Sequence, residues 1–300
     1  MYAVKLKIKS PMHMGEEGLG MEESAVMVHS DTLYCAIYDA WQELFPFEGD
    51  LPVCLSSAYP YVEDTFYFPK PSLPAPGFDK AETRDAYAKE VKKTQFIDKN
   101  TFAAWINNET IDFEQMKEKT QSLKKAITGS VRPRVALDRI TCAGNLYFVG
   151  EVLFNQSCDC GLYFLVDCEK KVWEKLQRVM LHLGESGIGG ERSCGYGRFS
   201  PEFVDNFILP TADPGDKYLT LSLLLPSDKK EATQAYSYRL LKRGGWSKNT
   251  PHKQVYMFTE GSIFSSPVQG KIATVADVGH PVYRFGRSFL VKVRCSGENI

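Results

Sequence analysis

A glycine-dense segment near residue 190 has the composition of an anion-binding loop. Residues 184–197 read GESGIGGERSCGYG and contain six glycines, directly after a stretch with helical spacing of apolar residues. Because glycine lacks a side chain, the backbone N–H groups of such a loop can approach a phosphate closely and adopt positive φ angles. Arg192 and Arg198 flank the loop, and their guanidinium groups can neutralise phosphate charge. The segment therefore predicts a phosphate-binding loop.

The order of elements around this loop narrows the class of phosphate ligand. Dinucleotide sites and P-loops place the glycines after a strand and before a helix, whereas here a predicted helix precedes the loop and a strand follows it. A flexible connector would be rich in serine and would lack embedded Ile, Tyr and Arg residues. We therefore expect the loop to bind the backbone of a polynucleotide. The residues expected to contact it are Ser186, Gly187, Gly189, Gly190, Arg192, Tyr196 and Arg198.

A second basic group lies around residue 134. Arg132 and Arg134 are two apart on a predicted strand and therefore share one face, as contacts to an RNA backbone require, and Arg139 follows them. A surface row of salt bridges would use the same residues, and this alternative stays open. A looser patch is formed by Lys89, Lys92, Lys93 and Lys99, which either contact RNA or face solvent.

His13 carries the alternative of an enzyme. It stands in a glycine-bearing loop after the first predicted strand, where an imidazole can act as general acid or base with Lys9 or His29 as its partner. In the other interpretation, His13 is a loop histidine that hydrogen-bonds RNA or protein backbone. Gly15 lies in the same loop, and its backbone could contact RNA as well. No residue clearly completes a catalytic pair, so we favour RNA contact at His13 and Gly15 and predict no catalytic residue.

Two groups of residues raise the question of a metal site. Cys158, Cys160 and Cys168 lie close together, but Cys-x-Cys is not a usual zinc spacing, and we expect all 8 cysteines to be reduced thiols. Two acidic pairs, at residues 16–17 and 22–23, lack a third ligand. We expect neither a metal nor a cofactor.

The net charge of the chain does not indicate a nucleic-acid partner. Lys and Arg number 36 and Asp and Glu 37, so any RNA site must come from local clustering of charge. No apolar run approaches the roughly 20 residues of a membrane span. The first residues, MYAVK, lack the layout of a signal peptide. We expect a cytoplasmic protein without membrane contact.

Periodicity predicts the elements that position these residues. Residues 2–8 alternate apolar and polar side chains as a half-buried strand does, with Lys5, Lys7 and Lys9 on a face that is solvated or binds RNA. Helices are predicted from Ser30 or Asp31 to residue 45 and around residues 173–183, because apolar residues recur on one face. Further strands are expected at 53–68, 134–137, 146–154, 162–166, 199–209, 218–225, 236–242, 254–259 and 289–295.

This order predicts an α+β fold made of two ferredoxin-like (RRM-type) domains. Residues 1–209 follow the split β-α-β plan of strand, helix, strand pair, helix and strand, and include the glycine-rich loop 184–197. Residues 79–130 are polar, lysine-rich and predicted helical, so we expect an insertion that projects outside the first sheet. Proline and glycine at 210–215 predict a linker. Residues 210–300 would form a second, degenerate ferredoxin-like domain.

The segment 184–199 resembles the glycine-rich loop of RAMP-superfamily proteins, and most closely that of the fourth subunit of type III-A CRISPR (Csm) complexes. Further blocks agree with that subunit in the same order along the chain. They are SPMHMG at 10–15, HSDTL at 29–33, RPRVALDR at 132–139, KRGGW at 242–246, EGSIF at 260–264 and HPVYRFG at 280–286.

The resemblance implies a prokaryotic, non-catalytic subunit that caps the 5′ handle of the crRNA guide. Its implied partners are the large polymerase/cyclase-bearing subunit on one side and the first backbone RAMP subunit on the other. Within the shared blocks we expect further RNA contacts at Ser30, Arg243, Trp246, Tyr283 and Arg284. Exposed Tyr196, Trp246 or Tyr283 would stack on unpaired bases.

Two other functions stay open from the sequence. RAMP relatives include endoribonucleases that process precursor crRNA, for which His13 would be the acid–base group. The chain would otherwise be an assembly subunit that contacts protein more than RNA. A defined cut in a repeat RNA would distinguish the nuclease, and crosslinking in the assembled complex would distinguish the assembly subunit.

Overall fold

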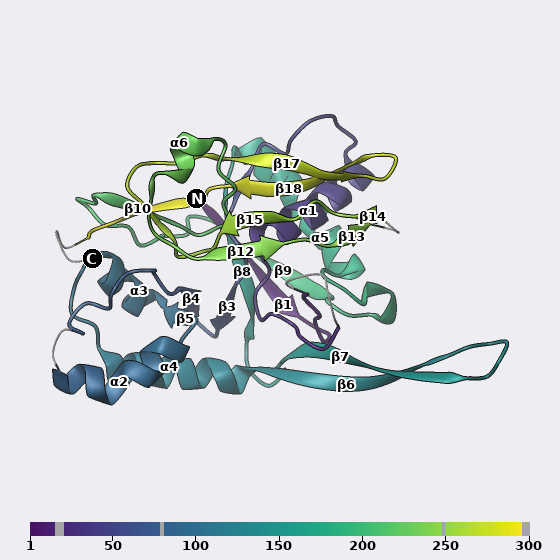
Figure 1. The fold of residues 1–300 in the computed structure, drawn as a ribbon, viewed down its shortest axis with the longest axis horizontal. Helices are drawn as coiled ribbons and strands as arrows, with labels where there is room; N and C mark the ends of the chain where they lie inside the picture. The colour runs from purple at the N-terminus through teal and green to yellow at the C-terminus, as the bar shows by residue number, and fades with distance from the viewer. Residues whose placement is uncertain (16–20, 79–80, 248–249, 296–300) are drawn as a thin grey trace.

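The computed structural model describes residues 1–15, 21–78, 81–247 and 250–295. It is built in layers: a central sheet with helices against it, a group of twisted ribbons above them, and one long hairpin that projects from the body (Figure 1). In the part of the chain that is described, no helix is both long and apolar enough to span a membrane.

The central sheet has seven strands, all paired antiparallel, in the order β5-β4-β3-β8-β1-β9, with β2 beside β3 on β8. The predicted first strand lies between two partners, since Val4 is paired with Phe164 on one side and with Phe203 on the other. The bounds of the strands are β1 Tyr2–Ile8, β2 Cys54–Leu55, β3 Tyr59–Val62, β4 Thr65–Pro69, β5 Phe96–Asp98, β8 Cys160–Asp167 and β9 Phe199–Val204.

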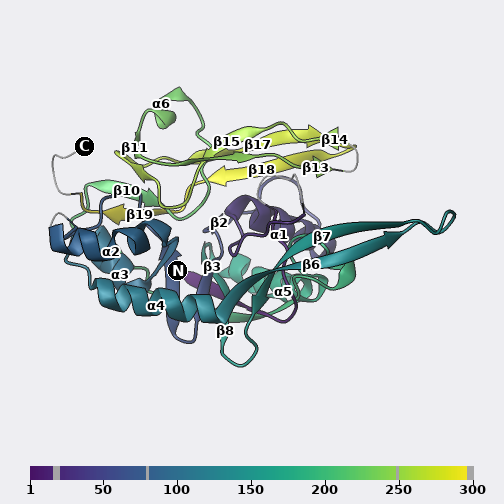
Figure 2. The ribbon, with the colours of Figure 1, turned by 60° about the horizontal axis from the view of Figure 1, so that its bottom comes forward.

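Two long helices, α1 (Ser30–Leu44) and α5 (Lys170–Ser186), form where the 3.6-residue periodicity predicts them. The two helices pack against each other, and α5 also packs on β9. Helix α1 lies beneath the hairpin that strands β17 and β18 form in the second half of the chain (Figure 2). Helix α1 begins at Ser30, one of the two predicted starts, but neither Ser30 nor Asp31 is its N-cap residue. The N-cap residue is His29, without a side-chain cap, because the side chains of Ser30 and Asp31 bind partners in the other half of the chain.

The described part of the predicted insertion is largely helical, with α2 Ala81–Lys93, α3 Lys99–Ile106 and α4 Phe113–Ala126. Four of its large apolar side chains are buried: Phe96, Phe102, Trp105 and Ile106. The expectation that it lies wholly outside the sheet is wrong, because β5 pairs with β4 and forms the edge of the sheet, with Ile97 opposite Phe68. Three residues are too few to show a strand period, so the sequence pattern did not reveal this strand.

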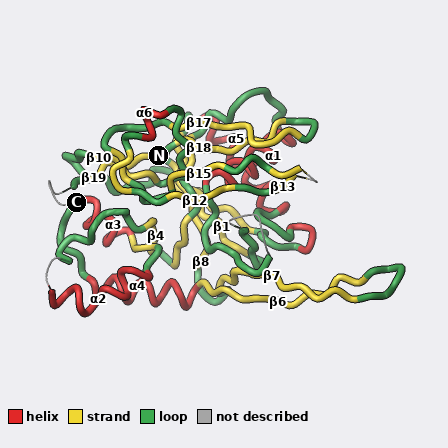
Figure 3. The backbone as a smooth tube through the Cα atoms, viewed as in Figure 1, coloured by secondary structure: helices red, strands yellow, loops and turns green. Residues whose placement is uncertain are grey.

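Strands β6 (Ile127–Leu137) and β7 (Gly144–Phe154) form a hairpin that leaves the body of the protein (Figures 1 and 3). The two pair with each other over their whole length, and an isolated bridge from Met12 to Val152 ties the base of the hairpin to the loop after β1. Beyond the base, large apolar side chains face solvent: Val131, Val135, Leu137, Ile140, Leu146 and Phe148. The sequence predicted strands here but not their departure from the sheet.

The second half is built of short strands. A four-stranded sheet has the order β11-β16-β10-β19, and the remaining strands pair as β12-β15, β13-β14 and β17-β18. The bounds are β10 Lys217–Thr220, β11 Ala235–Ser237, β12 Leu240–Arg243, β13 Trp246–Ser247, β14 Thr250–Pro251, β15 Val255–Phe258, β16 Ile263–Phe264, β17 Gly270–Asp277, β18 Pro281–Arg287 and β19 Leu290–Val293. Within described residues 210–247 and 250–295 the only helix is α6, Lys229–Ala232.

The core is continuous across the predicted linker. Buried side chains of the central sheet and of the second half, such as Leu219, Phe285 and Val293, belong to one apolar cluster. The ring of Tyr34 on α1 stacks on Phe285 of β18 with centroids 4.3 Å apart. The two halves therefore exclude water from a shared interior, which fixes the position of the second half on α1.

Candidate RNA-binding surface

The glycine-rich segment begins where α5 ends. Gly187 is the C-cap residue of α5 with a φ of 80°, and its N–H donates to the Leu183 carbonyl at 2.7 Å. The Ile188 N–H then donates to the carbonyl of Gly197 at 3.0 Å, which closes the segment on itself, and the Ile188 side chain is buried in the core. The segment is therefore a folded loop that is anchored at both ends.

The closed loop is also attached to the loop that follows β1. Gly190 N–H donates to the His13 carbonyl at 2.9 Å, and Gly197 N–H donates to the Pro11 carbonyl at 2.8 Å. The backbone N–H groups of Gly187 and Gly190, expected to bind phosphate, are thus already occupied by protein carbonyls. That part of the sequence-based mechanism is wrong, because sequence alone does not show which amides a tertiary contact will use.

Contact with the neighbouring backbone explains the glycines themselves. Gly197 has a φ of 70°, and a Cβ on it would lie 1.9 Å from the Ile188 carbonyl oxygen. A Cβ on Gly190 would lie 2.7 Å from Cδ2 of His13. A side chain at either position would force the two loops apart, so these glycines serve close packing between protein segments.

Part of the segment stays open to a ligand. The N–H groups of Gly189, Arg192 and Ser193 meet no hydrogen-bond acceptor among the described residues. The Arg192 side chain is exposed, as is Ser186 at the end of α5. Arg198 is exposed and forms an ion pair with Glu185.

Tyr196 is not the exposed stacking residue that the sequence suggested. Its side chain is buried, its hydroxyl donates to Glu151 Oε2 at 2.6 Å, and the Arg134 guanidinium lies 4.9 Å from the ring centroid. A tyrosine in a glycine-rich loop can be covered by a distant strand, and here β6 and β7 cover it. Tyr196 joins the glycine-rich segment to the hairpin.

The predicted arginine row lies on β6 beside this loop. Arg134 forms an ion pair with Glu191, and Arg132 Nε lies 3.4 Å from Oε1 of Glu151. The salt-bridge alternative is therefore realised at both arginines, although the Arg132 side chain is still about half exposed. Arg139 is exposed in the turn between β6 and β7. The sequence reasoning missed Glu151, whose one signal is a carboxylate inside the apolar run 146–154.

His13 is a buried loop residue. Its Nδ1 lies 2.7 Å from the Gly150 carbonyl, a contact in which the ring nitrogen must carry the proton. Of the two catalytic partners considered from the sequence, His29 is instead hydrogen-bonded to Glu260. The structure thus shows a hydrogen bond from His13 to protein backbone, which joins the loop after β1 to the hairpin.

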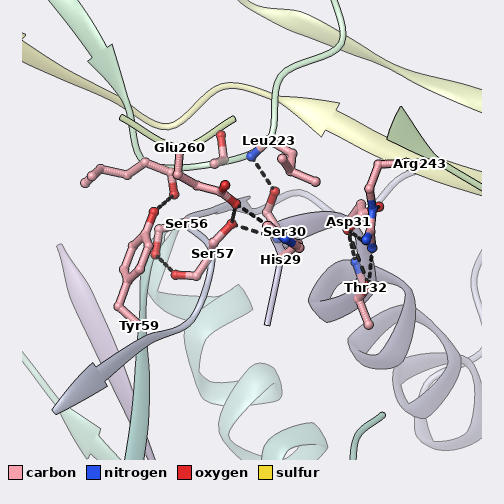
Figure 4. A network of polar contacts seen from close by, with 12 residues as sticks. His29, Ser30, Asp31, Thr32, Ser56, Ser57, Tyr59, Leu223, Arg243 and Glu260 are labelled. Carbon is pink, nitrogen blue, oxygen red and sulfur yellow. Dashed lines mark hydrogen bonds and ion pairs between the residues drawn. The ribbon is translucent and has the colours of Figure 1, made fainter. Parts of the chain in front are cut away.

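A buried polar network lies between α1 and the second half (Figure 4). Asp31 accepts from Arg243 Nε at 2.9 Å and from Arg284 Nη1 at 2.6 Å, and its side chain is fully enclosed. Burial by itself raises the pKa of Asp31, but the charges of Arg243 and Arg284 hold that pKa well below its usual range. Asp31 is therefore a buried carboxylate shared by two arginines.

The same network continues through a histidine and a glutamate. His29 Nδ1 lies 2.8 Å from Glu260 Oε1, and the Ser57 hydroxyl donates to the same oxygen. Burial lowers the pKa of His29, but the Glu260 carboxylate raises it more, so the net pKa is above the ordinary 6.5. Burial raises the pKa of Glu260, yet His29 lowers it below the ordinary 4.5. Both shifts favour the charged pair.

Three residues expected to bind RNA belong to this network instead. Ser30 is enclosed and accepts from the Leu223 N–H at 3.0 Å, while Arg243 and Arg284 are buried against Asp31. We correct their assignment: they join α1 to the second half. One signal could have indicated this. The shared blocks place Asp31 at the start of a predicted helix and Arg243 and Arg284 far along the chain, and such opposite charges can form a buried ion pair.

The remaining predicted residues are dispersed. Trp246 is 58% exposed on β13. Tyr283 is half-buried on β18 with its ring edge-on to Tyr38. Gly15 is exposed at the end of a described range. None of these three residues takes part in the contacts described above between the glycine-rich segment and the hairpin.

The acidic pair at residues 16–17 lies outside the described residues, and the pair at 22–23 is exposed. All 8 cysteines are free thiols. In residues 1–15, 21–78, 81–247 and 250–295 there is no group of three or more His, Cys, Asp or Glu side chains that could hold a metal ion.

The described residues form a mixed α/β protein in which the glycine-rich segment and the projecting hairpin meet. Residues 213–293 match the profile of the CRISPR Csm4 C-terminal domain. Over 246 residues, covering 78% of each protein, the chain is 32% identical to the CRISPR system Cms protein Csm4 of Thermococcus onnurineus (strain NA1). The chain therefore belongs to the Csm4 family, the RAMP-type subunit of the type III-A Csm complex.

Solved structures agree at the level of the fold. A crystal structure of a Csm1–Csm4 cassette in complex with cA4 contains a chain with a TM-score of 0.70, 23% identity and 99% coverage of both chains. A crystal structure of a Csm3–Csm4 subcomplex of the type III-A interference complex also gives a TM-score of 0.70, with 21% identity and coverage of 98% of this chain and 100% of that chain. The whole described architecture, including the second half, is thus a shared fold.

Proposed function

We propose that this protein is the non-catalytic crRNA-binding subunit that caps the 5′ handle of the guide in a type III-A CRISPR complex. One observation carries the proposal. The glycine-rich segment and the arginine-bearing hairpin meet through Tyr196, Glu151 and Arg134, so two separately predicted RNA elements form one surface. Membership of the Csm4 family supports the same role.

The chemistry of this surface suits the backbone of a single strand. Arg192 is exposed next to the unpaired N–H groups of Gly189 and Ser193, and Arg132 lies half exposed at the neighbouring hairpin. Charged side chains and free backbone amides of this kind contact phosphate oxygens. Since the whole chain has a formal net charge of −1, binding must depend on this local cluster.

We further propose that the protein links the large subunit, Csm1, to the backbone subunit, Csm3. The structures of a Csm1–Csm4 cassette and of a Csm3–Csm4 subcomplex support this arrangement. The projecting hairpin is suited to one of these contacts, since its far half exposes Val135, Leu137 and Leu146, and exposed apolar groups of this size mark interaction surfaces.

For the fold, we propose that residues 1–209 are a ferredoxin-like unit. The chain order β1, α1, β3, β8, α5, β9 gives the sheet order β3-β8-β1-β9, which is the arrangement of a split β-α-β unit. Residues 210–300 would be a reduced version of the same plan, because four strands remain in one sheet while, in its described part, the long helices are missing.

The nuclease alternative receives no support from the geometry at His13. A general base must reach the proton that it abstracts, but His13 is buried and its Nδ1 is hydrogen-bonded to the Gly150 carbonyl. We therefore keep the non-catalytic role.

The test is guide binding by the full chain over a salt series, with a repeat-derived handle RNA as probe. Removing one real phosphate contact in Arg192→Ala should reduce the slope of log affinity against log salt by roughly 0.7. Arg178→Ala is the matched control, because Arg178 is an exposed arginine on α5 that lies outside the proposed surface. An Arg192→Ala protein that folds and keeps the wild-type slope would remove the glycine-rich segment from the RNA site.

A further inference from the structure

We propose that the outward face of the ribbon over residues 238–247 and 250–258 is a second binding surface for single-stranded RNA, formed by residues other than those of the glycine-rich segment. This outer ribbon consists of β12 and β15 with β13 and β14 continuing them. The proposal extends the RNA-binding role proposed above to the other half of the protein and rests on that role only for the identity of the ligand as RNA.

The outer ribbon lies in the longest carboxylate-free stretch of the second half. No Asp or Glu occurs between Glu231 and Glu260, while five basic residues do: Arg239, Lys242, Arg243, Lys248 and Lys253. Every side chain in this stretch that is ionised at neutral pH is therefore positive, in a chain whose total charges nearly balance. Arg243 is turned inward to Asp31, whereas Arg239, Lys242 and Lys253 are exposed. The local field of the ribbon attracts a polyanion.

The strand register places aromatic and basic side chains on the same face. Lys242 is directly opposite Tyr256, and both are exposed, while the alternating residues Arg243 and Met257 are buried, and Arg243 reaches Asp31 on α1. Successive residues of a strand point to opposite faces, so the ribbon has one face committed to the core and one face left for a ligand. Tyr256 is 63% exposed, so its ring is open to a stacking partner.

Apolar groups extend this face along the ribbon. Leu240 is exposed opposite Phe258, which is itself buried in a small core cluster, and the half-exposed Tyr238 ring stands edge-on to Phe258 with centroids 5.1 Å apart. At the other end, beyond Gly244 and Gly245, Trp246 is exposed opposite Pro251. At a rise of about 3.3 Å per residue, the segment from Tyr238 to Trp246 spans at most about 26 Å, the length of several nucleotides.

This composition favours RNA over a protein partner. The centre of a protein interface is depleted in lysine, whereas here Lys242 lies in the middle of the exposed aromatic row. Aromatic rings interleaved with cations are the pattern on which single-stranded bases stack without sequence preference, because each base has a π-face and each lysine reaches a phosphate.

The ribbon is held rigidly from below, which a stacking platform requires. Arg243 and Arg284 bind Asp31 on α1, and Arg284 Nη2 also donates to the Gly244 carbonyl at 2.8 Å. The outward side chains Lys242, Trp246 and Tyr256 have no role in this network, so they can be replaced without removing the support.

The experiment uses the full chain and a fluorescein-labelled oligouridine, which lacks any handle sequence. Tyr256→Ala and Trp246→Ala should each weaken binding about tenfold, the usual effect of losing one stacked base. Lys242→Ala should reduce the salt slope by roughly 0.7. Tyr256→Phe, which keeps the ring, should bind like the wild type, and Leu181→Ala, at an exposed apolar residue of α5, should do the same. Circular dichroism and thermal unfolding confirm that the variants are folded.

The outcomes separate this proposal from the capping function. Loss of oligouridine binding in the ribbon variants with wild-type retention of the handle RNA supports a second site, whatever the Arg192→Ala result. Wild-type oligouridine affinity in folded Tyr256→Ala and Trp246→Ala proteins overturns it. If these variants keep RNA binding but lose capture by purified Csm1 or Csm3, the face is a protein-docking surface and the proposal is also overturned.

Discussion

Arg243 donates from Nε to Asp31 Oδ2 at 2.9 Å and from Nη2 to Oδ1 at 3.1 Å, although 212 residues separate the two in the chain. Asp31 is at the start of α1 and Arg243 ends β12, so this two-point contact joins the two halves of the protein. Both side chains are buried, and Arg284 from β18 binds the same carboxylate. Both arginines of the second half thus bind α1 through the single carboxylate of Asp31.

Replacing Asp31 should lower the stability of the protein. In Asp31→Asn the two arginines lose their counter-charge in a buried site, so we expect the free energy of unfolding to fall by about 3–5 kcal/mol. Urea denaturation followed by circular dichroism measures the change. The control is Asp50→Asn, because Asp50 binds Arg287 at 2.8 Å with both side chains nearly half exposed, and such pairs contribute at most about 1 kcal/mol. Equal losses in the two variants would contradict a central role for Asp31.

The His29–Glu260 pair should make stability depend on pH in a defined direction. The folded-state pKa of His29 is above the ordinary 6.5, so its contribution is complete below that value and is lost as pH rises through the folded pKa. The folded-state pKa of Glu260 is below the ordinary 4.5, so its contribution is complete above that value and is lost as pH falls. The pair therefore stabilises most between these two values.

The measurement compares wild type with His29→Gln/Glu260→Gln by urea unfolding at about pH 5.5 and about pH 8.5. The stability advantage of the wild type should be larger at the lower pH. His182→Gln serves as the control, since His182 contacts Glu43 at 2.6 Å on the surface, where solvent screens the pair. An advantage that is the same at both pH values would mean that folding leaves the pKa of His29 unchanged, which contradicts the raised pKa.

Glycine substitutions should test whether the segment 184–197 serves close packing. Gly197→Ala places a methyl group against the Ile188 carbonyl at a positive φ, and we expect a loss of at least about 1–3 kcal/mol in unfolding free energy. Gly129→Ala is the matched control, because a Cβ there meets nothing within 4 Å. Gly190→Val should displace the His13 ring and weaken guide binding at every salt concentration. A Gly197→Ala protein as stable as Gly129→Ala would show that the loop contact is loose.

Cleavage of target RNA should not depend on His13. In His13→Asn the side-chain amide can still donate to the Gly150 carbonyl, so the loop contact survives while the imidazole is lost. We expect the assembled complex to give the wild-type cleavage products at the wild-type rate. Gel analysis of a labelled target RNA measures this, with His280→Asn at an exposed histidine as control. A cleavage product missing only in the His13 variant would revive the nuclease function.

The projecting hairpin should matter for assembly and little for folding. Val135 and Leu146 are directly opposite each other and exposed, so Val135→Ser/Leu146→Ser should change the unfolding free energy by no more than about 0.5 kcal/mol per residue. Capture of purified Csm3 or Csm1 by the variant should fall. Leu44→Ser, at an exposed leucine that ends α1, is the control. Undiminished capture of both partners would assign the hairpin to RNA or to solvent.

Local pattern alone determined several parts of this protein. The alternation at residues 2–8 predicted β1, and the one-sided apolar rows predicted α1 and α5, because periods of 2 and 3.6 residues depend only on neighbours in the chain. The motif blocks indicated the family, which the comparison with Thermococcus onnurineus Csm4 confirms. These features are encoded within short windows.

The roles of individual motif residues were decided only by tertiary structure. Ser30, Arg243 and Arg284 looked like RNA contacts because charge and position in the sequence do not show what faces them, and their partners lie on the other half of the fold. The glycines of residues 184–197 predicted a phosphate-binding loop, yet the N–H groups of Gly197 and Gly190 donate to the Pro11 and His13 carbonyls. A hydrogen bond is satisfied by whichever acceptor the folded chain brings near, and sequence spacing does not contain that information.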